Sequence, residues 1–206
     1  MRKQAIYWMW ALVFLPAAIS AQTNLINAFA ESYELEEAGQ FQAAIEAVEV
    51  YYASDSYEIN LRLGWLHYLR GDYTQSRSYY KRCIFLEPKA IEPMLGVALP
   101  AGAMGNWTEV EKTYKSVLKI DPNNTFAHYR LASLYYEWQQ YDAAHTHLEK
   151  VLTLYPFDYE SVVLFAWVNY QIGHRSESRY FFYKALLIEP ESEWAAEGMK
   201  LVEEGL

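Results

Sequence analysis

Few residues in this sequence have the types and spacings that carry chemistry. His145 and His147 are two residues apart on an expected helix. At 3.6 residues per turn their side chains point about 200° apart, so they cannot both bind one metal ion. The sequence lacks a phosphate-binding glycine loop, a Gly-x-Ser-x-Gly elbow and a His-Glu-x-x-His motif. We therefore predict that the protein is not an enzyme and that it uses no cofactor and no metal.

The single cysteine, Cys83, excludes an intrachain disulfide and a thiolate metal site. At intervals of 34 residues its position is filled by small hydrophobic residues, Val117, Val151 and Ala185. We therefore expect Cys83 to be a buried core residue and not a nucleophile.

The composition is that of a folded protein that avoids nucleic acid. Hydrophobic residues make up 52% and aromatic residues 17% of the 206 residues, which is enough apolar surface for a core. The formal net charge is −9, and because residues 1–21 hold two bases and no acid, the remaining residues carry a net charge of −11. A surface of this sign repels phosphate backbones, so we predict no nucleic-acid partner.

Residues 1–21 contain a basic, an apolar and a small-residue segment in the order found in secretory signal peptides. A basic start precedes an apolar run over residues 5–19, and small residues follow up to Ala21. The run contains Pro16 and is shorter than the roughly 20 residues of a membrane-spanning helix. Cleavage after Ala21 or Ser20 is therefore favoured over an uncleaved membrane anchor. We predict export, to the periplasm if the source is Gram-negative and otherwise by secretion.

The clearest pattern is a period of 34 residues. It is carried by four prolines, Pro88, Pro122, Pro156 and Pro190. Because proline cannot continue a helix and disfavours a helical residue before it, each proline marks a helix end and a turn. The position 24 residues before each proline holds only small residues, Gly64, Ala98, Ala132 and Ala166. Small residues in this register let paired helices approach closely, so the pattern predicts repeated helix-turn-helix units.

This pattern resembles the tetratricopeptide repeat family, whose unit is a 34-residue helix-turn-helix with small, large and proline positions in the same register. The resemblance implies an all-α fold, a right-handed superhelical solenoid of about five such units closed by a C-terminal capping helix. One domain over residues 22–206 is expected. Its units would cover residues 25–56, 57–90, 91–124, 125–158 and 159–190, with the capping helix at 191–206.

Two positions depart from the family pattern. Pro100 lies inside the first helix of the third unit, where it removes a hydrogen bond at a cost of about 3 kcal/mol. We therefore predict a kink or break near Leu99 to Ala101 and the loosest part of the array there. In the fifth unit Arg175 replaces the aromatic residue that covers the turn in the other units.

In this family the first helices of the units line a concave groove that holds an extended peptide or a partner helix. Steps of three, four and three residues along each first helix define a stripe on one face. Its aromatic residues are the expected anchors, Trp65, Tyr68, Tyr129, Tyr136, Trp167 and Tyr170. Glutamates near the helix starts favour a cationic or neutral partner, Glu58, Glu92 and Glu160. A shift of one residue in register would instead place the aromatic residues in the core.

We therefore predict a scaffold or adaptor of the cell envelope that binds a protein or peptide partner in this groove. The alternative is a periplasmic glycan-binding accessory protein of polysaccharide assembly or export, because aromatic side chains beside carboxylates also stack on sugar rings. Two weaker alternatives are a hydrolase that uses Glu36 and Glu137 at the groove edge, and self-association through the groove or the first unit.

Overall fold

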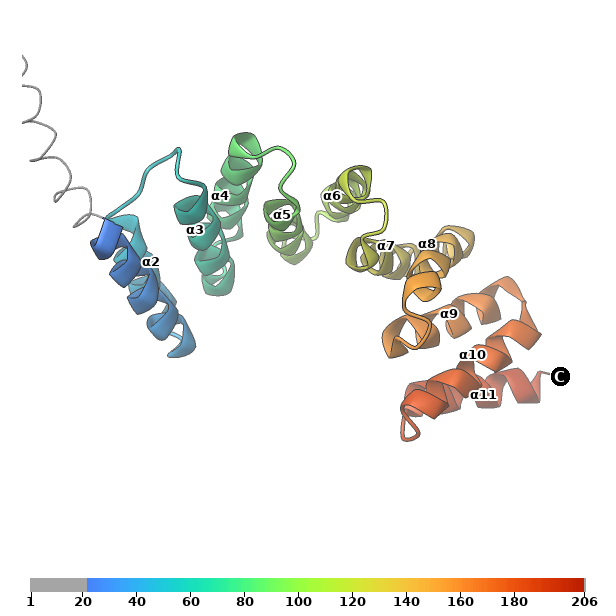
Figure 1. Ribbon diagram of the computed structural model, residues 1–206. Helices are drawn as coiled ribbons and strands as arrows, with labels where there is room; N and C mark the ends of the chain where they lie inside the picture. The colour runs from blue at the N-terminus through green and yellow to red at the C-terminus, as the bar shows by residue number, and fades with distance from the viewer. Residues whose placement is uncertain (1–21, 206) are drawn as a thin grey trace, which may run out of the picture. The chain divides into compact units, whose positions relative to one another are not determined.

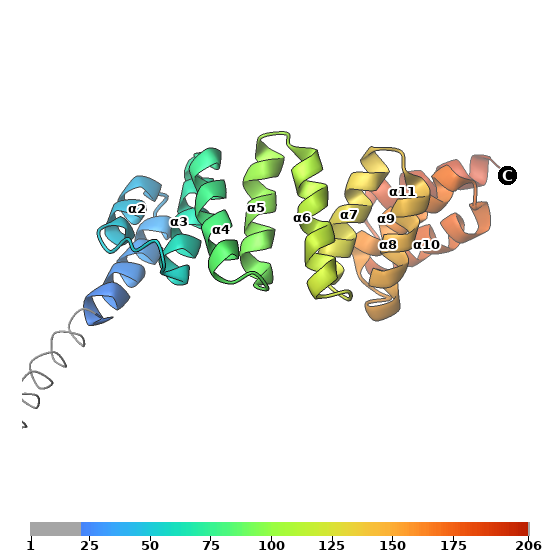
Figure 2. The same cartoon turned by 90° about the horizontal axis from the view of Figure 1, so that it is seen from above.

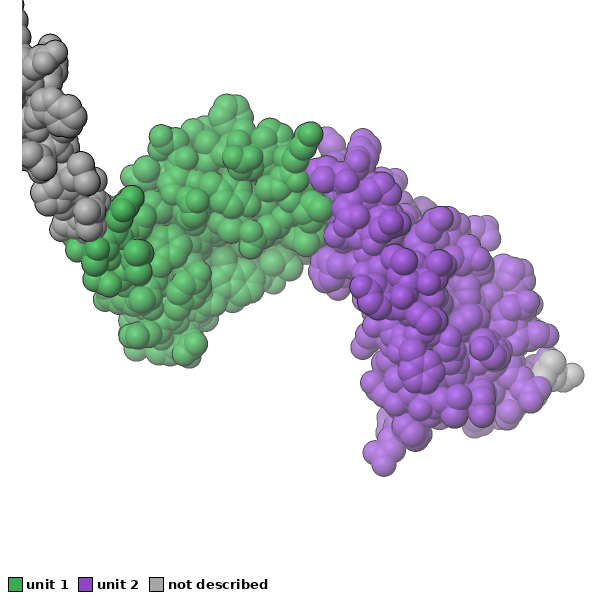
Figure 3. Space-filling model, viewed as in Figure 1, with its two compact units in different colours: residues 1–106 green, residues 107–206 purple. Residues whose placement is uncertain are grey.

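The computed structural model describes residues 22–205, and the signal peptide predicted for residues 1–21 lies outside them. The chain divides into two compact units, residues 1–106 and 107–206 (Figure 3). The boundary follows Asn106, in a turn within the third predicted repeat and within the span expected to form one domain.

The first unit consists of antiparallel helices packed in sequence order (Figure 1). Residues 22–37 are helical. The helices that follow are α2 (Phe41–Glu49), α3 (Tyr57–Arg70), α4 (Tyr73–Leu86) and α5 (Ile91–Ala103). A buried cluster that includes Ile45, Leu63 and Leu66 joins α2 to α3.

The second unit repeats this arrangement, and each of its helices packs on the next (Figure 2). Its helices are α6 (Trp107–Ile120), α7 (Thr125–Glu137), α8 (Tyr141–Leu154), α9 (Tyr159–Ile172), α10 (Arg175–Ile188) and α11 (Glu193–Glu204). Residues 22–205 contain helices and turns but no strand. The prediction of an all-α array of helical hairpins with a C-terminal capping helix is confirmed.

The 34-residue period sets where the helices begin and end. α4, α6, α8 and α10 each end two residues before one of the four prolines. Two residues after three of these prolines, a polar side chain accepts a hydrogen bond from the backbone N–H three residues further on: Asn124 (3.0 Å), Asp158 (3.0 Å) and Ser192 (3.1 Å). At α5 the equivalent residue is Ala90. A capping side chain at position 90 could not accept the equivalent hydrogen bond, because the third residue of α5 is Pro93, which has no N–H.

Glycines allow α3, α4 and α5 to pack closely. Ser76 Oγ donates a buried hydrogen bond to the carbonyl oxygen of Gly64 at 2.7 Å. A Cβ atom on Gly64 would lie 3.0 Å from the ring of Tyr80, and one on Gly96 would lie 2.4 Å from it. Tyr80 therefore fills the space that the two glycines leave, and Gly96 in particular leaves no room for a larger residue.

The break predicted at Leu99 to Ala101 is absent, because α5 remains α-helical from Ile91 to Ala103. Pro100 lies in the last turn of this helix and is buried. The one intrahelical hydrogen bond that it removes is the bond to the carbonyl group of Gly96, four residues earlier. Of the predicted kink or break, the break is therefore wrong, while the kink and the loosening of the array at this place stay predictions.

Candidate partner-binding groove

The titratable residues singled out in the sequence have separate structural roles. His145 Nδ1 lies 3.7 Å from a carboxylate oxygen of Glu149, whereas His147 Nδ1 lies 2.8 Å from His128 Nδ1. Cys83 is fully buried as predicted, and burial raises the pKa of its thiol to about 12. Across residues 22–205 no three His, Cys, Asp or Glu side chains are grouped to hold a metal ion. In the same range no helix has the length and apolar character needed to cross a membrane.

In the first unit the predicted stripe runs along α3 and α5. The rings of Trp65 and Tyr68 are partly buried and their centres are 5.7 Å apart. Glu58 and Glu92 are exposed in the first turns of α3 and α5. Burial raises the pKa of the Tyr57 hydroxyl, and the negative charges of Glu92 and Glu58 raise it further. Both glutamates therefore lie near one end of the stripe, as the sequence predicts.

A buried arginine network holds Trp65 in place. Arg62 is only 5% exposed and pairs with Glu36, while its Nε donates to Ser32 Oγ at 3.0 Å. The guanidinium carbon lies 3.9 Å from the centre of the Tyr33 ring. Trp65 Nε1 donates to the second carboxylate oxygen of Glu36 at 2.7 Å. Both oxygens of Glu36 are thus occupied, so this residue positions the indole and is not a free acid, as the hydrolase alternative would require.

In the second unit the stripe residues of α7 and α9 face each other. The hydroxyl of Tyr129 donates to a carboxylate oxygen of Glu160 at 3.4 Å. Burial, followed by this carboxylate, raises the pKa of Tyr129. Tyr136 is partly buried, and its ring centre lies 5.6 Å from that of Tyr141. Phe126, three residues before Tyr129 in the same stripe, is 51% exposed at the start of α7. The structure thus brings together the predicted residues of two successive hairpins.

Trp167 is a core residue and not an exposed anchor. It is 8% exposed, its ring packs edge-on against Phe182 with centres 5.1 Å apart, and it stacks with Trp194 of α11 at 6.1 Å. Its Nε1 is buried without a hydrogen-bond partner. Tyr170 lies at the edge of this cluster, 5.9 Å from Trp167. The capping helix covers this part of the stripe, so the anchor role predicted for Trp167 does not fit the structure.

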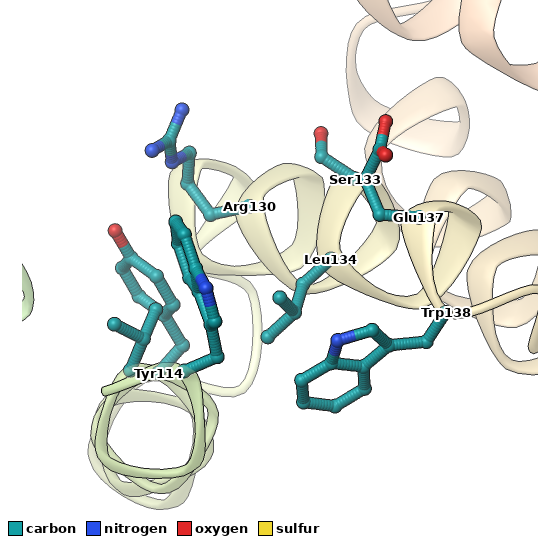
Figure 4. A pocket seen from close by; sticks show the side chains of 8 residues that line it. Tyr114, Arg130, Ser133, Leu134, Glu137 and Trp138 are labelled. Carbon is teal, nitrogen blue, oxygen red and sulfur yellow. The ribbon is translucent and has the colours of Figure 1, made fainter. Parts of the chain in front are cut away.

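A cleft of about 310 Å³ lies beside the stripe in the second unit. Figure 4 shows Arg130, Ser133 and Glu137 along α7, with Leu134 and Trp138 directed toward the space between α7 and α6. Ser133 lies in the stripe, four residues after Tyr129 and three before Tyr136, and it also lines the cleft. The stripe therefore borders an apolar recess that can accept a side chain. This recess was not predicted, because Trp138 follows the last residue of α7 and lies outside the periodic pattern.

Comparison with known families gives matches over both units. Two sequence models described as "Tetratricopeptide repeat" match residues 29–90 and residues 103–163, and together they cover more than half of the chain. A curated relative, the TPR repeat-containing thioredoxin TTL4 of Arabidopsis thaliana, is 33% identical over 95 residues. This alignment covers 46% of the chain but only 14% of that protein.

Solved structures show the same fold at low sequence identity. A tetratricopeptide repeat protein from Parabacteroides merdae matches with a TM-score of 0.75 and 18% identity, covering 88% of this chain and 73% of that one. YrrB, described as a TPR protein with an unusual peptide-binding site, matches with a TM-score of 0.70 and 12% identity over 91% and 97% of the two chains. MamA matches with a TM-score of 0.69 and 18% identity over 82% and 93%.

Proposed function

Because the chain belongs to the tetratricopeptide repeat family, whose fold supports protein–protein interaction, we propose that it is an exported adaptor that binds a segment of a partner protein along the stripe. The observation that carries this proposal is the fixed set of partly exposed aromatic side chains on the first helices of the hairpins. Trp65 is held by Glu36, and Tyr129 is held by Glu160. Side chains that are already ordered lose little further entropy when a partner binds.

The charges along the stripe favour a basic or neutral segment. Glu58, Glu92 and Glu160 are exposed near the starts of α3, α5 and α9. Arg62, in contrast, is buried and neutralised by Glu36. A basic partner would be attracted over roughly the Debye length, about 8 Å at physiological ionic strength. Its association should therefore slow as salt is added.

The proposed location is the cell envelope. It rests on the basic start, the apolar run and the small residues at the end of residues 1–21. In this setting the partner is a component of an envelope complex. The protein contributes recognition and no chemistry of its own.

The test is capture from an envelope extract of the source organism with the purified protein as bait. The groove variant combines Tyr68→Ala and Phe126→Ala, one substitution in each unit. The matched control combines Phe85→Ala and Tyr155→Ala, which remove aromatic side chains that are 71% and 58% exposed and lie outside the stripe. We expect wild type and control to retain a partner that the folded groove variant loses. Equal retention by all three proteins would overturn the proposal.

Glycan binding in the groove remains the alternative function, because the same aromatic residues and carboxylates suit sugar rings. Competition separates the two functions. An oligosaccharide that displaces the captured partner, or that binds wild type but not the groove variant, would favour the glycan function. Light scattering of the purified protein tests self-association, which predicts a dimer in wild type and a monomer in the groove variant.

A further inference from the structure

A second concave site lies between α10 and α11, and Arg175 in its lining adjoins the stripe at Tyr170. It is a pocket of about 530 Å³, within the range of about 300–1,000 Å³ typical of small-molecule sites. Its polar and aromatic lining residues are Arg175, Ser176, Arg179, Tyr180, Tyr183 and Glu203. At 100° per residue, Glu203 lies about 180° around α11 from Trp194, which packs toward the stripe. The pocket therefore opens on the side of α11 opposite Trp194, and its lining contains none of the predicted groove anchors.

Two arginines one helical turn apart line this pocket in an otherwise acidic protein. Arg179 is exposed and forms no ion pair within residues 22–205. The guanidinium of Arg175 lies 4.7 Å from the centre of the Tyr170 ring, and its Nη1 is buried without a hydrogen-bond acceptor. A buried N–H without an acceptor is unfavourable. A positive charge at the first residue of α10 is also disfavoured by the helix dipole. The Nη1 atom without an acceptor is enclosed beside Gly205 and does not face the pocket, so an anion bound in the pocket would offset only the dipole effect, through its negative charge.

The pocket offers an explanation for the arginine at position 175, where the other units have an aromatic residue. The other units place an aromatic residue at this position, and here the guanidinium packs on an aromatic ring instead. This substitution keeps the turn covered and adds a planar donor that matches carboxylate or phosphate geometry. Arg179, four residues later, offers a second such donor on the same face.

The remaining lining residues favour a hydroxyl-bearing ligand. Tyr180 and Tyr183 are 58% and 55% exposed, so their ring faces are available for stacking. Ser176 and the two tyrosine hydroxyls both donate and accept hydrogen bonds, whereas the Glu203 carboxylate only accepts. Glu203 would accept hydrogen bonds from sugar hydroxyls, which the side chains of an acidic peptide lack. We propose that this pocket binds an acidic sugar, whose anionic group is held by Arg175 and Arg179 and whose ring lies against Tyr183.

The test is an NMR titration of the purified protein with four probes: trigalacturonic acid, glucose 6-phosphate, neutral maltotriose and triglutamate. We expect at least one of the two anionic sugars to bind saturably, and neither maltotriose nor triglutamate. The two anionic sugars distinguish a carboxylate from a phosphate ligand. Binding of maltotriose or of triglutamate with an affinity equal to that of the anionic sugars, or no binding of either anionic sugar, would overturn the proposal.

Matched variants locate the site. Arg179→Gln should weaken binding of the anionic sugar about tenfold, since it removes a charge-assisted hydrogen bond. Tyr183→Ala should also weaken it, by the loss of stacking. Lys150→Gln removes an equal charge from an exposed residue of the same unit, on α8 and outside the lining of both the groove cleft and this pocket, and should change nothing. Equal affinity of wild type and the folded Arg179→Gln variant would refute the site. Partner capture by the groove should not change in this variant, so the two proposals can fail separately.

Discussion

The histidine pair of the second unit should make its stability depend on pH. His128 Nε2 lies 3.0 Å from the carbonyl oxygen of Pro122, which can only accept, so this nitrogen carries the proton. In a neutral ring His128 Nδ1 is then an acceptor, and His147 Nδ1–H donates to it at 2.8 Å. Tyr135 stacks on the other ring with centres 5.6 Å apart. The packing thus fits a neutral His147.

Adding a proton to His147 is unfavourable in the folded state. Burial, then the neighbouring His128 and then Lys115 on α6 lower the pKa of His147 to about 4. Glu111 faces the same cluster but is hydrogen-bonded to Lys115 and Tyr135. An unfolded histidine titrates near pH 6.5, so the unfolded state binds more protons between about pH 6.5 and pH 4. Stability is therefore full above pH 6.5 and is lost as the pH falls, by about 3 kcal/mol at pH 4.

Urea unfolding followed by circular dichroism at pH 7, 5.5 and 4 measures this loss. The comparison is with His147→Asn, whose amide keeps a donor for His128 Nδ1 but does not titrate. Other groups titrate in both proteins, so the difference between the two curves isolates His147. The wild type should lose about 2–3 kcal/mol more than the variant over this range. Parallel pH curves would refute the role assigned to His147.

Three further substitutions and one labelling experiment test the packing. Gly198→Ala would place a Cβ atom 2.1 Å from the Phe182 ring, and should cost about 1–3 kcal/mol in urea unfolding. Gln139 has a φ of 59° where other units have glycine, so Gln139→Gly should stabilise by up to about 1 kcal/mol, and a loss of stability would contradict this reasoning. Asp158→Ala removes the cap of α9 and should lower the free energy of unfolding by about 1 kcal/mol. Cys83 is fully buried and its pKa is about 12; it should react with iodoacetamide only as the protein unfolds, and rapid labelling of the native protein would show that it is accessible.

The repeated part of the fold was predictable because one period controls several properties at once. Prolines at 34-residue intervals mark the ends of α4, α6, α8 and α10, and small residues in the same register mark where helices pack closely. The stripe of partly exposed residues on α3 and α7 also follows from this register, since side chains three and four residues apart share a helix face.

The features that were not predictable depend on contacts between distant residues or on the ends of elements. Burial of Trp167 depends on where α11 lies, and a stripe drawn on α9 alone cannot contain this information. Likewise, the pairing of Arg62 with Glu36 joins two helices across 26 residues. Pro100 was expected to kink or break its helix on the average behaviour of proline, but α5 continues past it to Ala103 with the loss of the one hydrogen bond to Gly96.

Site-specific photo-crosslinking in living cells tests the groove most directly. A photoreactive amino acid would replace Ser133, which lies in the stripe of the second unit beside the cleft, or Thr153, which is exposed on α8 outside the stripe. We predict that one envelope protein is crosslinked from position 133 and not from position 153. Crosslinking of that protein from both positions, or from position 153 alone, would contradict binding in the groove.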